Sequence, residues 1–187
     1  APLTIQFPER QISSEELSAD QFYNRLREMA PEVPTTSQPS SGFFTQLYKS
    51  LGGDEEILSI HISSGLSGTV ESARLGAEHA QGQKITVVDS MTLSGGERFQ
   101  VIAAARAIQA GWTKDQILER LAHIRAATEV VFTLETLEYL ARGGRIGRVQ
   151  AIAGSLLHLK PVIHVAKEDG KYSTVGRGRT INRALNA

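Results

Sequence analysis

Two short apolar runs, each followed by a segment rich in serine and glycine, constrain the fold most strongly. Residues 57–62 (ILSIHI) lead into "SSGLSGT", and residues 84–89 (KITVVD) lead into "SMTLSGGE". Apolar runs of this length bounded by turn residues are typical of buried strands, and a helical pattern follows each of them. We therefore predict βαβ units with a parallel sheet that helices cover on both faces. Such sheets bind ligands beyond the carboxyl ends of their strands, where both Ser/Gly-rich segments lie.

The other elements of the first two thirds follow from apolar spacing and capping patterns. "APLTIQF" at residues 1–7 reads as a strand, and "PEVPTTSQPSS" at residues 31–41 reads as a loop stiffened by proline. Two of the helices begin with a capping-box pair, Ser18 with Gln21 and Thr113 with Gln116. Helices are expected over residues 18–29, 43–51, 96–110 and after Thr113. In the helix over residues 43–51, Leu51 is expected to belong to the buried stripe. A third strand is expected over residues 130–134.

The pattern changes after about residue 134. A short helix leads into "ARGGRIGR", residues 149–159 suggest a small apolar helix, and two strands are joined at "EDG", which is a hairpin signal. We predict a boundary near residues 125–135. Residues 1–128 would form an α/β parallel-sheet domain without its first strand, and residues 129–187 a partial second domain of mixed α/β character.

Composition excludes several classes of function. The chain has 20 Lys+Arg and 20 Asp+Glu, so it lacks the basic excess of a nucleic-acid-binding surface. It has no cysteine, which excludes disulfides, thiolate metal sites and cysteine nucleophiles. Neither a metal-binding motif nor a Walker A sequence occurs. No apolar run has the roughly 20 residues of a membrane span, so a cytoplasmic protein without stable membrane insertion is the default expectation.

The segment "SSGLSGT" has the composition of an anion-binding loop. Backbone N–H groups at a strand-to-helix turn favour an anion, and Gly65 permits close approach or unusual φ. The alternative is that these residues only cap the helix, although one cap does not need four hydroxyls. A serine nucleophile is disfavoured because the G-x-S-x-G spacing is absent and no base is positioned, with His61 the nearest candidate.

The motifs TTSQPSSGFF, SIHISSGLSGTVESARLGAE, VVDSMTLSGGE, TLEYLARGGRIGR and GSLLHLKPVIHV together resemble the DegV family in order and spacing. The resemblance covers most of residues 1–165. It implies a two-domain α/β fold that binds a long-chain fatty acid, such as palmitate, stearate or oleate, between its domains. It also implies that the protein is no enzyme and needs no cofactor, and that it presents the acyl chain to a fatty acid kinase for acyl phosphate formation. The family's first strand and about its last hundred residues have no counterpart here, so the chain is expected to be truncated at both ends.

The resemblance also implies the residues of the site. Hydroxyls of Thr36 and of Ser63 or Ser64 would hold the carboxylate with Gly65 beside them, and Ser64 is slightly favoured. Arg145 would lie near the head group or face the kinase. No catalytic or metal-binding residue is expected. Plausible contacts of the acyl tail, which are equally ordinary core residues, are Phe43, Ile152, Leu156 and Ile163.

Two other functions remain open from the residues. "SSGLSGTVE" is superficially similar to the phosphate loop of sugar-phosphate isomerases, so a phosphosugar enzyme or phosphate-binding protein is one alternative. It lacks a convincing Glu/His acid–base pair and leaves the TSQPS segment unexplained. A regulatory or structural module with an empty cleft is the other.

Overall fold

The computed structural model describes residues 1–51, 53–149 and 160–185. Its contacts divide the chain into two compact units. Unit 1 comprises Ala1–Ile57 and Glu71–Ile85, and unit 2 comprises Leu58–Val70 and Thr86–Ala187. The boundary that the sequence suggested near residue 128 stays a prediction.

Unit 1 contains a small antiparallel sheet in the order β2-β1-β3, with α1 packed against it. The strand expected at the start of the chain is present, but the expected loop over residues 31–41 is partly wrong because "TTS" forms an edge strand. Thr36 pairs with Ile5 at the centre of that strand, a partner about thirty residues away that local sequence does not reveal. The elements are β1 (Thr4–Gln6), β2 (Gln11–Ser13), η1 (Ser14–Glu16), α1 (Ala19–Glu28) and β3 (Thr35–Ser37).

Helices α2 (Ser41–Ser50) and α3 (Thr69–His79) pack closely in unit 1. Phe44 and Tyr48 of α2 are buried and stacked. A Cβ on Gly76 would lie 2.5 Å from the Cβ of Phe44, so only glycine permits this approach. The expected burial of Leu51 is wrong: its side chain is 55% exposed, because α2 ends at Ser50.

The predicted parallel pair of strands is present as β4 (Glu56–His61) and β5 (Lys84–Asp89). Ser90 donates its N–H to the carbonyl of His61, and Ser63 donates to that of Thr92. Both segments run in the same direction between these bonds, which agrees with the parallel pairing of the strands they follow. Helices α4 (Ser94–Gln109) and α5 (Lys114–Ala127) form an antiparallel pair beside this sheet, with the predicted Thr113–Gln116 capping box at the start of α5. Their shared core consists of Ala104, Ala107, Ile117 and Leu121 against Leu58, Ile60, Val88 and Ala103.

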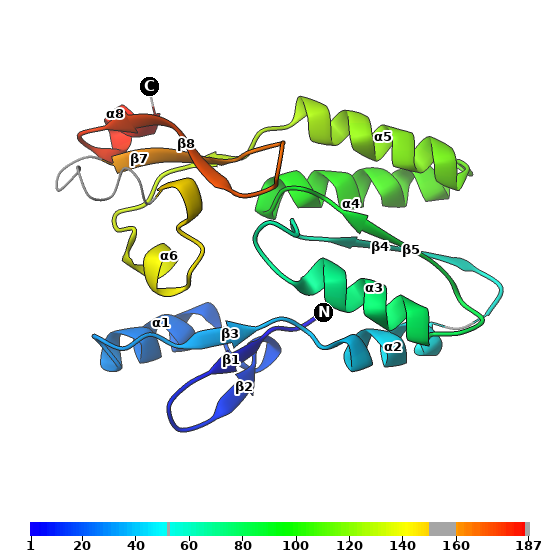
Figure 1. Ribbon diagram of the computed structural model, residues 1–187, viewed down its shortest axis with the longest axis horizontal. Coiled ribbons are helices and arrows are strands. Elements are labelled where there is room, and N and C mark those ends of the chain that lie inside the picture. The colour runs from blue at the N-terminus through cyan, green and yellow to red at the C-terminus, as the bar shows by residue number, and fades with distance from the viewer. Residues whose placement is uncertain (52, 150–159, 186–187) are drawn as a thin grey trace. The chain divides into compact units, whose positions relative to one another are not determined.

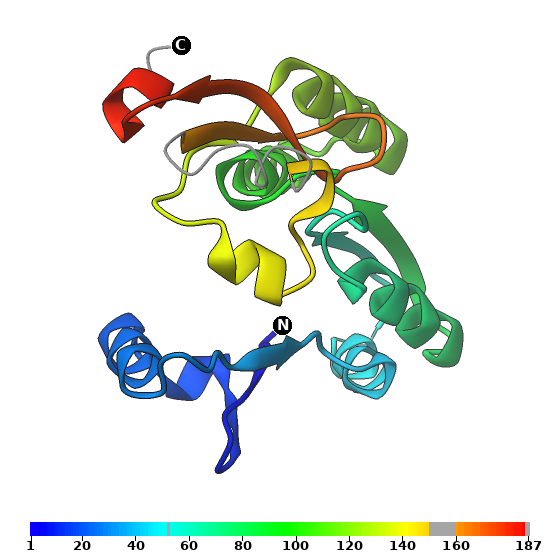
Figure 2. The same ribbon diagram turned by 60° about the vertical axis from the view of Figure 1, so that its left-hand side comes forward.

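The third strand does not join the parallel sheet, and that part of the prediction is wrong. β6 (Val131–Phe132) pairs antiparallel with β7 (Lys160–Val165), which forms the predicted hairpin with β8 (Tyr172–Gly178). The apolar residues of β6 find a partner in the second half of the chain, which the linear pattern did not show. Helix α6 (Glu138–Arg142), η2 (Gly147–Val149) and α8 (Ile181–Leu185) also belong to the described part of unit 2, and α8 lies beside the end of the hairpin (Figures 1 and 2). The apolar helix expected at residues 149–159 lies almost entirely outside the described residues.

Candidate functional site: the Ser/Gly loop at the strand ends

The segment Ser63–Thr69, which we call the Ser/Gly loop, follows β4 at the carboxyl end of the parallel pair. Its first residue, Ser63, is completely buried. The Ser63 hydroxyl donates to the carbonyl of Gly170 at 2.8 Å and accepts from the N–H of Gly65 at 3.2 Å. Both hydrogen-bonding roles of this hydroxyl are therefore filled within the protein.

The turn of the β7–β8 hairpin packs backbone to backbone against the Ser/Gly loop. A Cβ on Gly65 would lie 2.4 Å from the carbonyl oxygen of Asp169, and one on Gly170 would lie 2.0 Å from the Ser63 hydroxyl oxygen. Neither distance is compatible with a side chain. Gly170 also has a φ of +65°, whereas Gly65 does not have a positive φ. Close approach, rather than unusual φ, is thus the reason for Gly65.

Most backbone N–H groups of the Ser/Gly loop donate to other groups of the protein. Ser64 donates to both carboxylate oxygens of Asp89, at 3.2 and 3.3 Å. Leu66 and Ser67 donate to the carbonyl of Ser63. Thr69 donates to the hydroxyl of Ser67. The anion that the Ser64 amide binds is the chain's own Asp89, and few loop amides are left for a ligand, which would be bound mainly by side chains.

The hydroxyl of Ser64 differs from its neighbours in the loop. Ser64 is exposed, and its hydroxyl makes no hydrogen bond with a residue that the structure describes. Ser67 and Thr69, in contrast, share a hydrogen bond of 2.8 Å between their hydroxyls. Within this loop, Ser64 is the residue that offers a free donor and acceptor to a ligand.

The segment after β5 forms a second ordered turn at the same end of the sheet. Asp89 also accepts the N–H of Met91 at 2.9 Å, so one carboxylate links the ends of both strands. Met91 and Ser94 have φ values of 53° and 51°, a conformation that side chains usually avoid. The buried Gln100 side chain donates to the carbonyl of Ser90 at 3.0 Å and anchors this turn to α4. Asp89 and Gln100 were not among the residues that the sequence indicated, since their roles depend on contacts between separate elements.

His61 is the last residue of β4. Its Nε2 lies 2.8 Å from the hydroxyl of Ser59, on the preceding part of β4. Burial lowers the pKa of His61, an effect that the nearby Asp89 carboxylate opposes. This arrangement agrees with the expectation that His61 is a packed strand residue.

The remaining predicted site residues lie on other elements. Thr36 lies exposed at the centre of β3, in unit 1, and shares a sheet face with its cross-strand partner Ile5. Arg145 follows α6 in unit 2, is exposed, and donates to the carbonyl of Gly143 at 2.6 Å. Its charge opposes the upward shift of the pKa of Tyr172, for which burial is the larger cause.

The proposed tail contacts are only partly described. Ile163 is fully buried in a cluster with Ile146 and Val149, so it is a core residue of unit 2. Phe43 is half-buried on α2. Ile152 and Leu156 lie outside the described residues.

Two further hydroxyls could not have been singled out from sequence. The Oγ1 atoms of Thr133 and Thr174 are buried and have no hydrogen-bond partner among the residues that the structure describes. Across the described part of the chain, no group of three His, Cys, Asp or Glu residues could hold a metal ion. No helix among the described residues is long and apolar enough to cross a bilayer.

The fold and this loop define an α/β protein with a hydroxyl-lined turn beyond its parallel strands. The family model described as an uncharacterised protein of the DegV family matches residues 1–187, and the chain belongs to that family. A DegV domain-containing protein from Deinococcus radiodurans is 42% identical over 187 residues, which is 100% of this chain and 64% of that protein. The chain thus spans just under two thirds of the length of this relative.

Solved structures of the family have the same fold. A fatty-acid-binding DegV family protein from Thermus thermophilus aligns with a TM-score of 0.88 at 37% identity, covering 99% of this chain and 65% of that one. A stearic-acid-binding protein from Eubacterium ventriosum aligns with a TM-score of 0.86 at 28% identity, covering 99% and 65%. The predicted DegV-like α/β fold is therefore confirmed.

Proposed function

We propose that the protein, at its full length, binds a long-chain fatty acid whose carboxylate accepts hydrogen bonds from the hydroxyls of Ser64 and Thr36. The observation that carries the proposal is the exposed, unpartnered hydroxyl of Ser64 on a loop that the hairpin braces. Family relatives described as binding fatty acids support the ligand class. Palmitate, stearate and oleate are the expected ligands.

The division of roles follows from the chemistry of an amphiphile. Each buried CH₂ of the acyl chain contributes about 0.8 kcal/mol, so the tail would dominate affinity. Two hydroxyl donors to a carboxylate would contribute about 1.5–3 kcal/mol each and fix its orientation. Ser63 would position Ser64 rather than touch the ligand, because its own hydroxyl is already bonded to Gly170 and Gly65.

The site would hold lipid for a partner enzyme. A carrier of this kind needs no catalytic base, and the Nε2 of His61 lies 2.8 Å from the hydroxyl of Ser59 on its own strand. We propose that a fatty acid kinase transfers the γ-phosphoryl group of ATP to the presented carboxylate. Arg145, exposed next to α6, would lie near the head group or contact the kinase. A cytoplasmic location stays a prediction.

The phosphate-loop alternative has less support. A phosphate-binding turn needs free N–H groups, whereas Ser64, Leu66 and Ser67 donate theirs to Asp89 and to the Ser63 carbonyl. A thermal shift with oleate but none with a phosphosugar would favour the carrier. The reverse result would favour the phosphosugar protein.

The decisive test uses the full-length protein purified from cells. Native mass spectrometry should show a co-purified acyl chain, and Ser64→Ala with Thr36→Ala should weaken oleate binding about 100-fold or more. Thr35→Ala with Ser37→Ala is the matched control, because these exposed hydroxyls lie on the opposite face of β3. The absence of any acyl chain, or an unchanged affinity in the Ser64/Thr36 variant, would contradict the proposal.

A further inference from the structure

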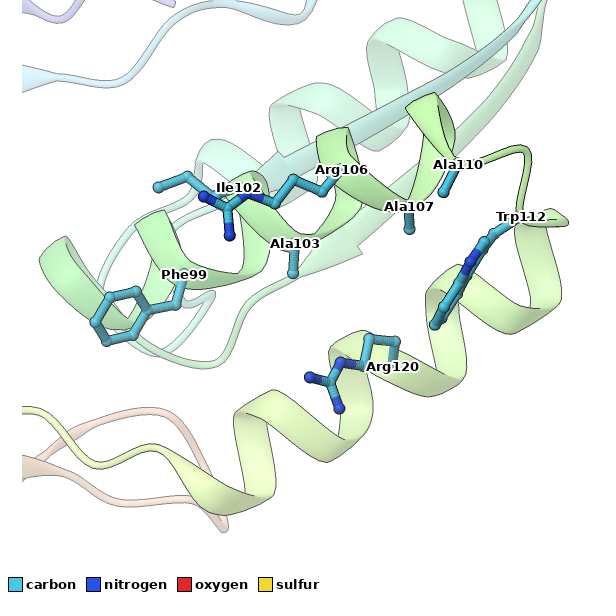
Figure 3. Close-up of a pocket in the computed structure, with 8 residues that line it drawn as sticks. All are labelled: Phe99, Ile102, Ala103, Arg106, Ala107, Ala110, Trp112 and Arg120. Carbon is cyan, nitrogen blue, oxygen red and sulfur yellow. The ribbon is translucent and has the colours of Figure 1, made fainter.

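A groove of about 410 Å³ runs between α4 and α5 in unit 2 (Figure 3). Phe99 and Trp112 lie at its two ends, and alanine side chains of α4, such as Ala103, point toward α5 along its floor. Arg106 projects from α4 and Arg120 from α5. No residue of the Ser/Gly loop lines this groove, so it is separate from the site proposed above.

The groove exposes groups that a monomer usually covers or pairs. Phe99 is 57% exposed and Trp112 46% exposed, next to a partly exposed Ile102. Neither Arg106 nor Arg120 forms an ion pair or side-chain hydrogen bond with any residue in the described ranges. Aromatic and arginine side chains together are the composition of protein–protein interface centres. The two unpaired guanidiniums indicate that the missing partner is acidic.

The shape of the groove favours a helix over a small molecule. Its α4 wall extends from Phe99 to Ala110, which is about 16 Å or three helical turns. The alanine floor permits a second backbone to approach closely, and the large exposed fractions show an open groove. Small ligands prefer sites that enclose most of their surface. A two-fold pairing of this face with a second copy would put the arginines of both copies into one interface whose lining contains no carboxylate, and is unfavourable.

We propose that this groove is the docking site for an amphipathic helix of a partner protein, with apolar residues for Phe99 and Trp112 and carboxylates for Arg106 and Arg120. The apolar face of that helix would cover the two aromatic rings. Aspartate or glutamate at its margins would accept hydrogen bonds from the two guanidiniums. The inference does not depend on the nature of the ligand at the Ser/Gly loop.

The test follows Trp112, the one tryptophan in these 187 residues, by fluorescence in the full-length protein. The difference between wild type and Trp112→Phe isolates its signal. The probe is a synthetic 15-residue helical peptide with leucines on one face and flanking glutamates, compared with the same peptide carrying lysines. The acidic peptide should shift the Trp112 emission saturably, with a Kd on the order of 10–100 μM, and the basic peptide should not.

Charge reversal gives the matched comparison. Arg106→Glu with Arg120→Glu should weaken binding of the acidic peptide at least about tenfold and create binding of the basic one. Arg98→Glu with Arg125→Glu makes the same change of net charge with one exposed arginine from each helix outside the groove, and should leave both affinities unchanged. Circular dichroism checks that both variants are folded. The preference of the wild-type protein for the acidic over the basic peptide is measured without a variant, so it does not depend on the folding of one.

Four results would overturn the proposal. One is equal binding of both peptides, and another is loss of binding in the Arg98/Arg125 control alone. A third is a Trp112 emission already shielded from iodide in the free full-length protein, since the chain itself would then cover the groove. The last is displacement of the peptide by oleate in the Ser64/Thr36 variant, which would make the groove a lipid site.

Discussion

The Ser/Gly loop and the α4–α5 groove belong to the same unit but treat their polar groups in opposite ways. In the loop, the Ser63 hydroxyl, the Asp89 carboxylate and most backbone amides are paired with one another. In the groove, Arg106 and Arg120 have no partner among the described residues, and Phe99 and Trp112 are largely exposed. The loop with the most conspicuous sequence thus pairs most of its polar groups within the protein, with the Ser64 hydroxyl as an exception, whereas the ordinary helical sequence leaves two exposed arginines without a described partner.

This difference separates residues that build a site from residues that bind. A buried hydroxyl with both roles filled stabilises its loop, and its removal leaves unpaired groups behind. An exposed group without a partner contributes little to folding and is available to a ligand. Stability and binding measurements should therefore respond to different residues in the two regions.

The largest expected effect is at the contact between the hairpin and the Ser/Gly loop. Gly170→Ala would place a Cβ 2.0 Å from the Ser63 hydroxyl and would also strain a residue with a φ of +65°. We expect a loss of about 3 kcal/mol or more in the free energy of unfolding, measured by denaturant titration. Gly111→Ala is the control, because Gly111 has a φ of +76° in open space and should cost only about 1 kcal/mol.

Gly65→Ala isolates the steric part of the same contact, because Gly65 does not have a positive φ. The added Cβ would meet the backbone of Asp169 and Gly170, and overpacking of this kind costs about 1–3 kcal/mol. Gly95→Ala in α4 meets no atom within 4 Å and should instead be neutral or stabilise by up to about 1 kcal/mol. Equal effects at positions 65 and 95 would show that the hairpin does not brace the loop.

The middle-sized effect distinguishes the adjacent serines. Ser63→Ala removes two hydrogen bonds and leaves the Gly170 carbonyl without its donor, so about 1–3 kcal/mol of stability should be lost. Ser64→Ala should change stability by no more than about 0.5 kcal/mol while it weakens oleate binding. Thermal unfolding and oleate titration of both variants measure the two responses. A large loss of stability in Ser64→Ala and little change in Ser63→Ala would contradict the roles given to the two serines.

The local elements were predictable because their signals lie within a few residues. Apolar runs gave β4 and β5, and Ser18–Gln21 and Thr113–Gln116 marked the starts of α1 and α5. Which strands pair with each other was harder to predict from the sequence. β3 pairs with β1 about thirty residues away, and β6 turns to β7 rather than to the parallel sheet, because partners are chosen by tertiary packing.

The candidate site shows the same limit at the level of single residues. The Ser/Gly composition correctly marked an ordered loop at the strand ends, as the spacing of a βαβ unit implies. It could not show that Gly170, 107 residues away from Ser63, occupies the hydrogen bond that a ligand would otherwise take. It also could not show that Asp89 accepts the Ser64 amide, since this contact exists only when both strands are paired.

The smallest expected effect concerns two carboxylates near the start of α4. Asp89 accepts N–H groups of Ser64 and Met91, whereas the half-buried Glu97 carboxylate accepts no hydrogen bond within the described ranges. Burial raises the pKa of Glu97 above its ordinary value of 4.5. The folded state therefore binds more protons than the unfolded state between the pKa values of Glu97 in the unfolded and folded states. The stability that this group contributes falls as pH rises through that window.

Glu97→Gln should remove this loss and stabilise the protein at pH 7 by at most about 0.5 kcal/mol, since the side chain is partly solvated. The gain should disappear below pH 4.5, where Glu97 is protonated in both states. Urea titrations of both proteins from pH 4 to 7 measure this trend, and a gain that persists at pH 4 would point to packing rather than to the buried charge.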